Sequence, residues 1–265
     1  MKTRFKLTML FIATFAVLIV GCSKDDNGPD PTVDPTCTDG IKNGDETGID
    51  CGGSCTPCED AILEGILEED RTLSADITYS LKGTFSVASG NTLTIPAGTK
   101  IVAAVESGDR TSTYIVVQKG GRIDIQGTAA APVIMTSANE KPGDWGGLVI
   151  AGDATTTEGI NATAEVGQII YGGNNDTDNS GSINYLIINY AGAQINAESQ
   201  FNGLTLYAVG SETSISNVAI LNGTDDGVEF FGGTVSASNL YLENNEDDSV
   251  DWTEGWNGTL TDTYV

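Results

Sequence analysis

A repeat of 22 residues near the C-terminal end constrains the fold of this chain more than any other feature. Residues 216–230 align with residues 238–252, and Ser, Asn, Asp and Val recur at matching positions. A constant period of this length, containing two or three short strands, is typical of one coil of a parallel β-helix, in which each coil buries apolar residues against the next. We therefore predict an all-β parallel β-helix (solenoid) over residues 60–265. A sandwich of hairpins would have no reason to repeat at a fixed offset.

Short β-branched runs separated by Gly, Asn and Asp mark the expected strands. They lie at residues 92–95, 114–117, 122–125, 133–136, 148–150, 186–188, 204–206 and 218–221. Residues 153–181 are polar, glycine-rich and weakly periodic, so we expect long loops that project from one coil. Residues 259–265 resemble the start of a third copy, in which Tyr264 matches Tyr241 after one inserted residue. Because a solenoid needs a polar cap on its last coil, we expect the given sequence to be an incomplete, C-terminally truncated β-helix.

The first residues have the order of a secretory signal. Basic residues up to Lys6 precede an apolar run over residues 7–20, which is shorter than the roughly 20 residues of a membrane span. The run ends in Gly21-Cys22, which resembles the lipobox of bacterial lipoproteins, where the cysteine is acylated. We predict a lipoprotein signal peptide over residues 1–21 and a lipid anchor at Cys22. An ordinary signal peptide followed by a spare cysteine is the alternative.

The segment after Cys22 predicts a stalk at the cell surface. Residues 22–36 are rich in Pro and Asp and contain no apolar run, which predicts a lipidated flexible stalk. The run Ser23 to Asp26 is similar to the signal that sends lipoproteins of the Bacteroidetes to the outer face of the outer membrane. That resemblance implies an outer-membrane protein exposed at the cell surface.

The charge of the chain restricts its partners. The formal net charge is −25, and removal of residues 1–21 takes away basic residues only. Nucleic acid is therefore excluded, whereas cations, neutral glycans and basic proteins remain compatible. The sequence contains no His, and no Lys or Arg follows Lys141.

Residues 37–58 form a cysteine-rich module with four of the five cysteines. Its cysteines are Cys37, Cys51, Cys55 and Cys58. An even number of cysteines in an exported segment with few hydrophobic residues predicts two disulfides, with the pairing left open. A four-cysteine zinc site is the alternative, because the last two have ligand spacing.

Acidic residues lie between these cysteines. They are Asp39, Asp45, Glu46 and Asp50, which could surround a calcium ion or form a solvated turn. The module is similar to a short spacer that recurs in bacterial surface proteins, and that similarity implies no activity.

Several ordered motifs extend the resemblance over residues 75–265. They are the runs at residues 142–150, 171–181, 202–206 and 225–234. Together they are similar to a family of Bacteroidetes surface lipoproteins, and the resemblance implies a right-handed parallel β-helix of the pectin-lyase type without a particular activity.

The repeat stacks acidic residues on one another. Equivalent positions in stacked coils lie about 4.8 Å apart. The affected carboxylates are those of Asp225, Asp226, Glu229, Asp247, Asp248 and Asp251. Like charges this close are costly unless a cation binds, some are protonated, or they reach solvent. We expect Ca²⁺, the usual partner of oxygen ligands outside the cell, with a solvated turn or a catalytic site as alternatives.

A second calcium motif is incomplete. Asp176 and Asp178 stand at the first and third positions of an EF-hand-like loop, with Gly181 at the sixth. The twelfth position holds Ile187 instead of the bidentate Glu, so a simple turn is the alternative.

Two functions from different classes follow. The first is a non-catalytic surface lipoprotein whose calcium-stabilised β-helix presents loops to a glycan or a protein, with Trp252 and Trp256 as sugar-stacking platforms and Trp145 in packing. The second is a polysaccharide lyase or a glycoside hydrolase. Lyases of this fold use an Arg or Lys as the base, and residues 142–265 contain neither. A hydrolase would use a pair of carboxylates drawn from Asp225, Asp226, Asp247 and Asp248.

Overall fold

The computed structural model describes residues 37, 41–46, 48, 51–55, 61–105, 113–196 and 199–265. Every regular element in this described part is a β-strand, and no helix in it is long and apolar enough to cross a membrane. The strands are β1 (Ile62–Leu67), β2 (Arg71–Thr72), β3 (Thr78–Val87), β4 (Thr92–Pro96), β5 (Lys100–Ala103), β6 (Tyr114–Val117), β7 (Arg122–Gln126), β8 (Val133–Ser137), β9 (Leu148–Ala151), β10 (Ala162–Thr163), β11 (Ile170–Tyr171), β12 (Gly181–Asn189), β13 (Leu204–Tyr207), β14 (Ser214–Leu221), β15 (Val228–Phe231), β16 (Ser236–Glu243), β17 (Val250–Thr253) and β18 (Leu260–Tyr264).

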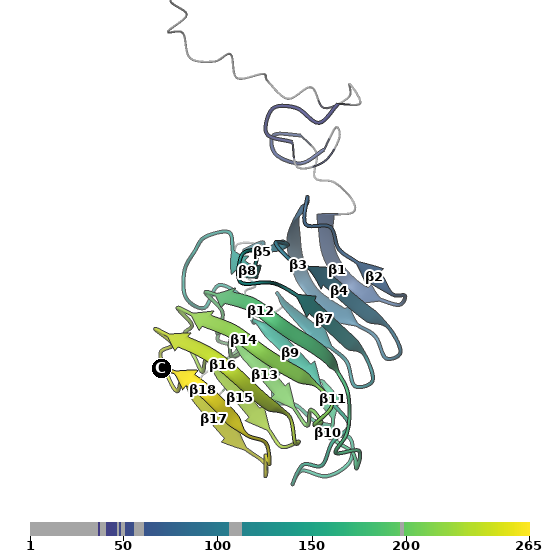
Figure 1. Ribbon diagram of the computed structural model, residues 1–265, viewed down its shortest axis with the longest axis vertical. Helices are drawn as coiled ribbons and strands as arrows, with labels where there is room; N and C mark the ends of the chain where they lie inside the picture. Colours follow the sequence, from purple (N-terminus) through teal and green to yellow (C-terminus); the bar gives the residue numbers. More distant parts are fainter. Residues whose placement is uncertain are drawn as a thin grey trace, which may run out of the picture. The chain divides into compact units, whose positions relative to one another are not determined.

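The strands wind into a parallel β-helix with three faces (Figure 1). The first face contains β5, β8 and the second halves of β12, β14 and β16. The second face contains β6, β9, β13, β15 and β17. The third contains β4, β7 and the first halves of β12 and β14. The long strands therefore bend and serve two faces, and the predicted all-β parallel solenoid is confirmed.

The register confirms the repeat. Val228 pairs with Val250, and Val218 pairs with Leu240, so positions 22 residues apart in the chain stack directly. Tyr241 pairs with Tyr264, as the expected third copy requires.

Two ladders of asparagine hold the ends of the first face. Asn222 donates its side-chain amide to Asn189, and Asn244 donates to Asn222, at 3.3 Å in both cases. A second ladder joins Asn184, Asn217 and Asn239. Four of these residues adopt φ between 55° and 57°, a left-handed conformation that Asn tolerates better than most residues. The chain can therefore turn each corner while neighbouring coils share hydrogen bonds.

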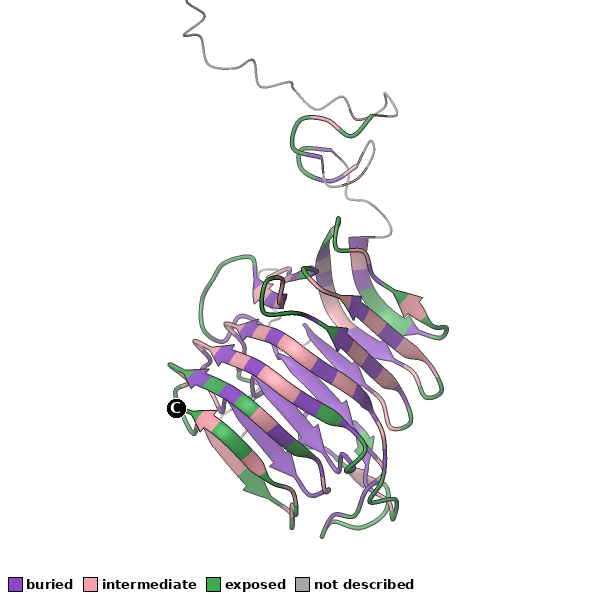
Figure 2. Ribbon diagram, viewed as in Figure 1, coloured by how far each residue is buried: buried purple, intermediate pink, exposed green. Residues whose placement is uncertain are grey.

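The second face differs from the other two in being buried on both sides. Its strands β6, β9, β13 and β15 are buried at every position, whereas β14 and β16 alternate between buried and more exposed residues (Figure 2). The inner side belongs to the main core, with Ile150, Leu206 and Phe230 at most 1% exposed. The outer side packs into a second apolar cluster, to which Ala164, Val166 and Ile169 contribute.

The cover over the second face is the segment between β9 and β12. It includes the antiparallel pair β10 and β11 and fills the region where we predicted projecting loops. That prediction was wrong about their direction, because their apolar side chains fold back onto the sheet instead of extending into solvent.

The cysteine module contains a disulfide between Cys37 and Cys55. Cys51 is disulfide-bonded as well, and Cys58 lies outside the described residues. The alternative of a four-cysteine zinc site is wrong, because sulfurs in a disulfide cannot act as thiolate ligands.

Two carboxylates of the module already have protein partners. Asp45 accepts a hydrogen bond from the Ser54 hydroxyl at 2.8 Å, and Glu46 accepts one from the backbone amide of Asn43 at 3.0 Å. The other two, Asp39 and Asp50, lie outside the described residues. So do residues 1–36, which include the predicted signal peptide, Cys22 and the stalk.

Candidate functional site

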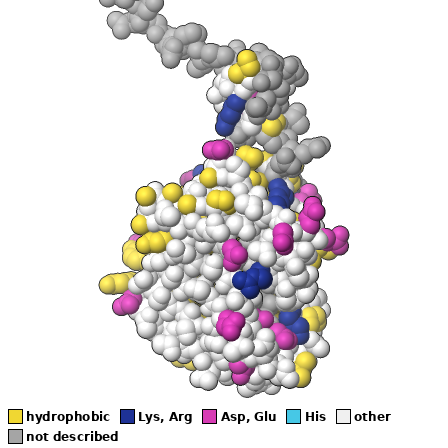
Figure 3. Space-filling model, turned by 45° about the vertical axis from the view of Figure 1, so that its right-hand side comes forward, with side chains coloured by type: hydrophobic (Ala, Val, Ile, Leu, Met, Phe, Trp, Pro, Cys, Tyr) yellow, Lys and Arg dark blue, Asp and Glu magenta, His cyan; other side chains and the backbone are white. Residues whose placement is uncertain are grey.

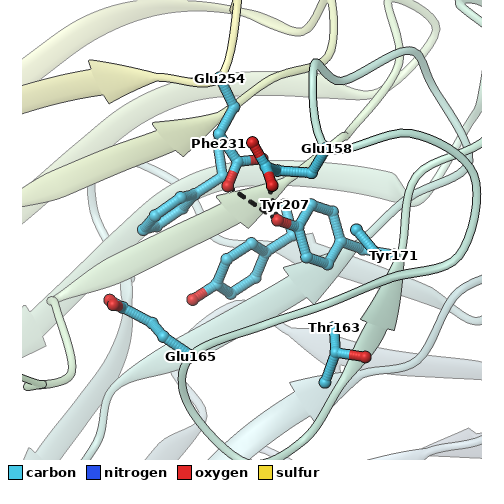
Figure 4. A pocket seen from close by; sticks show the side chains of 8 residues that line it. Glu158, Thr163, Glu165, Tyr171, Tyr207, Phe231 and Glu254 are labelled. Carbon is cyan, nitrogen blue, oxygen red and sulfur yellow. Dashed lines mark hydrogen bonds between the residues drawn. The ribbon is translucent and has the colours of Figure 1, made fainter.

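A pocket of about 350 Å³ lies on the outer side of the second face, under the covering segment (Figure 4). Its lining residues are Glu158, Ala162, Thr163, Glu165, Tyr171, Tyr207, Phe231 and Glu254. The segment between β9 and β12 supplies five of them, while β13, β15 and the turn after β17 supply the others. The site thus exists only where the covering segment meets the stacked coils.

Aromatic rings form the floor of the pocket. Tyr207 and Phe231 occupy paired positions of adjacent strands, so their rings stack with centroids 4.3 Å apart. Tyr171, from β11, packs against Tyr207 at 4.7 Å. Each of the three side chains is at most 7% exposed. The floor is therefore a closely packed aromatic surface.

Glu254 is held in place by two hydroxyl groups. The Tyr171 hydroxyl donates to the carboxylate at 2.8 and 2.9 Å, and the Thr156 hydroxyl donates to it at 2.7 Å. Burial and this hydrogen bond raise the pKa of Tyr171 above its usual value, so the phenol stays protonated and remains a donor. The carboxylate consequently has a fixed orientation at the rim of the pocket.

The hydroxyl of Tyr207 has no such partner. Tyr207 is 1% exposed, and its hydroxyl forms no hydrogen bond with any residue in the described part of the chain. Figure 4 shows this hydroxyl directed to the side of the pocket where Glu165 lies. Burial followed by the charge of Glu165 raises the pKa of Tyr207. The hydroxyl is not among the fully buried polar atoms that lack a partner, so it is reached from the pocket and can donate to a ligand there.

Acidic groups at the rim are not balanced by basic ones. Burial, followed by the charge of Glu254, raises the pKa of Glu165. The nearby Lys119 is engaged elsewhere, with its ammonium 3.0 Å from Asp153 and 2.7 Å from the side chain of Asn161. On the molecular face shown in Figure 3, Asp and Glu side chains outnumber the Lys and Arg side chains that lie among them.

The predicted acidic ladder lies on the same outer side of the second face. Glu229 pairs with Asp251 across β15 and β17, and one carboxylate oxygen from each of Asp226, Glu229 and Asp251 lies within 4.8 Å of the others. A second group within the same distance contains Asp225, Asp226 and Asp247. The stacking of negative side chains that the repeat predicted is therefore present.

Burial disfavours the ionised form of three carboxyl groups of the ladder. It raises the pKa of Asp225 to about 7, with the charges of Asp226 and Asp247 adding to the effect. Burial also raises the pKa of Asp226 to about 6 and that of Glu229 to about 8. These groups are protonated in part near neutral pH unless a cation compensates their charge.

Asn202 adds a neutral oxygen to the ladder. Its side chain is 2% exposed and donates to Glu229 at 2.6 Å, whereas its Oδ1 is buried without a hydrogen-bond partner among the described residues. Side-chain amide oxygens are among the ligands that calcium accepts besides carboxylates. The sequence analysis did not identify Asn202, because it stands outside the 22-residue repeat.

Other predicted site residues have different surroundings. Asp248 contacts the ladder through its backbone amide, which donates to Asp226 at 2.8 Å. Asp176 accepts from the backbone of Thr155 at 2.9 Å, and Asp178 accepts from the Ser180 hydroxyl at 3.0 Å. Neither Asp176 nor Asp178 joins an acidic group of three or more in the described chain, so these side chains anchor the covering segment.

The three tryptophans have different surroundings, and the role of Trp252 as a sugar-stacking platform stays a prediction. Trp256 stacks on the core residue Phe230 at 4.4 Å and donates to the carbonyl of Val235, so its interpretation as an exposed platform is wrong. Trp252 is 61% exposed, but it pairs with Phe230 and therefore belongs to the inward-facing row of the last described coil. Trp145 is fully buried, as predicted for a packing residue.

The pocket itself escaped the sequence analysis. Its residues come from the covering segment, from β13 and β15 and from the turn after β17, so no spacing along the chain links them. One signal was present: β6 and β9 carry apolar residues at consecutive positions instead of alternate ones, which is typical of strands covered on both sides.

A comparison with protein families gave one match, a pectate-lyase-like beta helix domain over residues 65–265. Neither a curated protein nor a solved structure matches the chain. The expected pectin-lyase-like fold is thus supported, while the right-handed sense of the coil, the kinship with Bacteroidetes lipoproteins and the spacer module remain predictions.

Proposed function

The chain belongs to the family of pectate-lyase-like beta helix domains, and from that premise we propose that its β-helix binds a glycan in the pocket on the second face without cleaving it. The observation that carries the proposal is the hydroxyl of the buried Tyr207 side chain, which is directed into the cavity and has no hydrogen-bond partner among the residues that the structure describes. A cavity of this size suits a small ligand or a single sugar residue of a longer chain.

The chemistry of the rim supports a polyhydroxylated ligand. Sugar hydroxyls are both donors and acceptors, and the pocket offers the complementary set: carboxylate acceptors at Glu158, Glu165 and Glu254 and a phenol donor at Tyr207. A glycan rich in carboxylates would be repelled by the same rim.

Binding is tested with a panel of soluble oligosaccharides and isothermal titration calorimetry. Tyr207→Phe removes only the unpartnered hydroxyl, so we expect affinity for the bound glycan to fall about fivefold to tenfold, as for the loss of one hydrogen bond. Tyr241→Phe is the matched control, because Tyr241 is exposed on β16 and bonds to Glu243 outside the pocket.

Two results would contradict this proposal. One is equal affinity of wild type and Tyr207→Phe for every glycan that binds. The other is the appearance of shorter glycan products that Asp226→Asn abolishes, which would favour the alternative of a hydrolase that uses the ladder.

We also propose that Ca²⁺ binds the ladder and stabilises the last coils. Two ligands of one calcium ion lie at most about 5 Å apart, since each bond measures about 2.4 Å. The oxygens of Asp226, Glu229 and Asp251 meet this limit, and Asn202 adds a buried amide oxygen with no partner in the described chain. When bound, the ion would neutralise charges that otherwise repel one another.

Calcium is tested by thermal unfolding with and without the ion. We expect added Ca²⁺ to raise the melting temperature of the wild type, with a gain in stability of about 2.7 kcal/mol at a hundred times the dissociation constant. Asp226→Asn and Glu229→Gln should abolish the gain, whereas Asp176→Asn should retain it. A melting temperature unaffected by Ca²⁺ in the wild type would refute the site.

The N-terminal motif supports a lipid anchor at Cys22 on the outer membrane, exposed at the cell surface. Labelling with a fatty acid analogue should mark the wild type and leave Cys22→Ala unmarked. Labelling of both would contradict the anchor.

A further inference from the structure

The pocket on the second face combines three carboxylates with no basic lining residue. Glu158 and Glu165 come from the segment between β9 and β12, Glu254 comes from the turn after β17, and every other lining residue is neutral. No Lys or Arg follows Lys141 in the sequence, and the ammonium of Lys119 already contacts Asp153, Asn161 and the carbonyl of Gly172. The negative charge of the pocket therefore has no partner within its lining.

A bare metal ion does not suit this arrangement. Metal ligands must converge on one point, and the groups of acidic side chains with oxygens within 4.8 Å of one another include none of these three glutamates in the described chain. The carboxylates instead stand around a cavity of about 350 Å³. A cation that fits must be part of a larger organic ligand.

The carboxylates of Glu254 and Glu165 differ in the hydrogen-bond donors that contact them. Glu254 accepts hydrogen bonds from the hydroxyls of Tyr171 and Thr156. Glu165 has no hydrogen-bond donor among the described residues, and it lies close enough to Tyr207 and Glu254 for their charges to influence one another. An ammonium group bound beside Glu165 would supply the donor that this carboxylate lacks, and its charge would also be attracted by Glu254 and by the faces of aromatic rings.

Resting on the glycan-binding function proposed above, we infer that the sugar residue bound in this pocket carries a protonated amine. The ligand class is then a glycan that contains an amino sugar without its acetyl group. A neutral sugar residue would leave the rim uncompensated, and an N-acetylated residue would replace the ammonium by a neutral amide.

The test uses three oligosaccharides of the same linkage and length: oligomers of glucosamine, N-acetylglucosamine and glucose. Their affinities for the whole protein are measured by isothermal titration calorimetry at about pH 6, below the usual pKa of an amine. We expect the glucosamine oligomer to bind about tenfold more tightly than the other two, and this preference to shrink at high salt.

Variants of the pocket glutamates test whether these residues cause the preference for the glucosamine oligomer. Glu254→Gln and Glu165→Gln should each remove most of the tenfold difference, because each takes away one charge that faces the amine. Glu64→Gln is the matched control: Glu64 is exposed on β1, so the variant loses the same overall charge and should keep the preference.

The possible outcomes separate the inference from the function on which it rests. Equal affinity for the glucose and glucosamine oligomers overturns the inference and leaves glycan binding intact. Equal affinity for a lysine homopeptide and the glucosamine oligomer, lost in Glu254→Gln, also overturns it, because the pocket would then recognise amines of proteins. Binding of none of the probes, including the wider panel of glycans, overturns both.

Discussion

The outer sides of the first and second faces belong to the same coils but have different environments. On the first face, Ile187, Ala219, Tyr241 and Tyr264 lie in register, and the two tyrosines are 49% and 70% exposed. On the second face, Tyr207 and Phe231 occupy corresponding outward positions and are at most 7% exposed. The backbone geometry is the same in both, so the difference comes from what covers them.

The cover creates the site. A parallel β-helix needs only its inward rows to form a core, so its outward rows are free to vary. One long connection, between β9 and β12, folds over the second face and brings Glu158 and Glu165 to strands that already present aromatic rings. The stacked coils thus provide a rigid floor, and the connection provides most of the rim.

The largest expected effect comes from truncating matched tyrosines on the two faces. Tyr207→Ala should lower the free energy of unfolding by about 3 to 5 kcal/mol, because it opens a cavity in a packed cluster. Tyr241→Ala should change it by less than about 0.5 kcal/mol. Thermal unfolding followed by circular dichroism measures both. Similar losses in the two variants would mean that the cover does not pack as described.

An intermediate effect is expected from pH. The folded-state pKa values of Asp225, Asp226 and Glu229 are about 7, 6 and 8, above the value of about 4 for unfolded carboxyls. The folded protein therefore holds more protons than the unfolded chain between about pH 4 and 8, and its stability should fall as the pH rises through this range without calcium. The asparagine ladders of the first face have no such dependence, since amides do not titrate.

Glu229→Gln tests that difference. We expect the variant to be more stable than the wild type at about pH 8 by about 2 kcal/mol and equally stable at about pH 4. Glu243→Gln, on the exposed side of β16, should follow the wild type at both values. The prediction is contradicted if, in the presence of a chelator, the free energy of unfolding of the wild type increases between about pH 5 and 8. Ionisation of the ladder would then not destabilise the folded protein.

The smallest effect concerns the fastening of the cover. Lys119→Met removes the contacts with Asp153, Asn161 and the carbonyl of Gly172, and we expect a loss of about 0.5 to 1 kcal/mol because the ion pair is partly exposed. Amide hydrogen exchange should accelerate over residues 153–172 and stay unchanged in β14 and β16. Lys100→Met, exposed on β5, serves as control. Uniform acceleration in both regions would refute a local role for Lys119.

The acidic ladder could be predicted from the sequence because a repeat translates directly into stacking. Once Val228 and Val250 occupy equivalent positions, Glu229 must lie beside Asp251, whatever the rest of the coil does. The contribution of Asn202 could not be predicted in this way, because the coil that contains it has a different length from the next. The exposure of Trp256 was misjudged for a related reason: its neighbours in sequence are polar, but its neighbour in space is Phe230.

The sequence by itself determined the winding of the chain, the stacking of residues 22 apart and the accumulation of carboxylates along one side. These properties depend on periodicity, which is a local pattern repeated. Only the tertiary structure decided where the segment between β9 and β12 would lie, and with it the pocket lined by Tyr207, Glu165 and Glu254. That placement depends on contacts between apolar side chains that are far apart in the sequence. Because the hydrophobic effect is non-directional, an apolar residue in the sequence does not indicate which other residue will cover it.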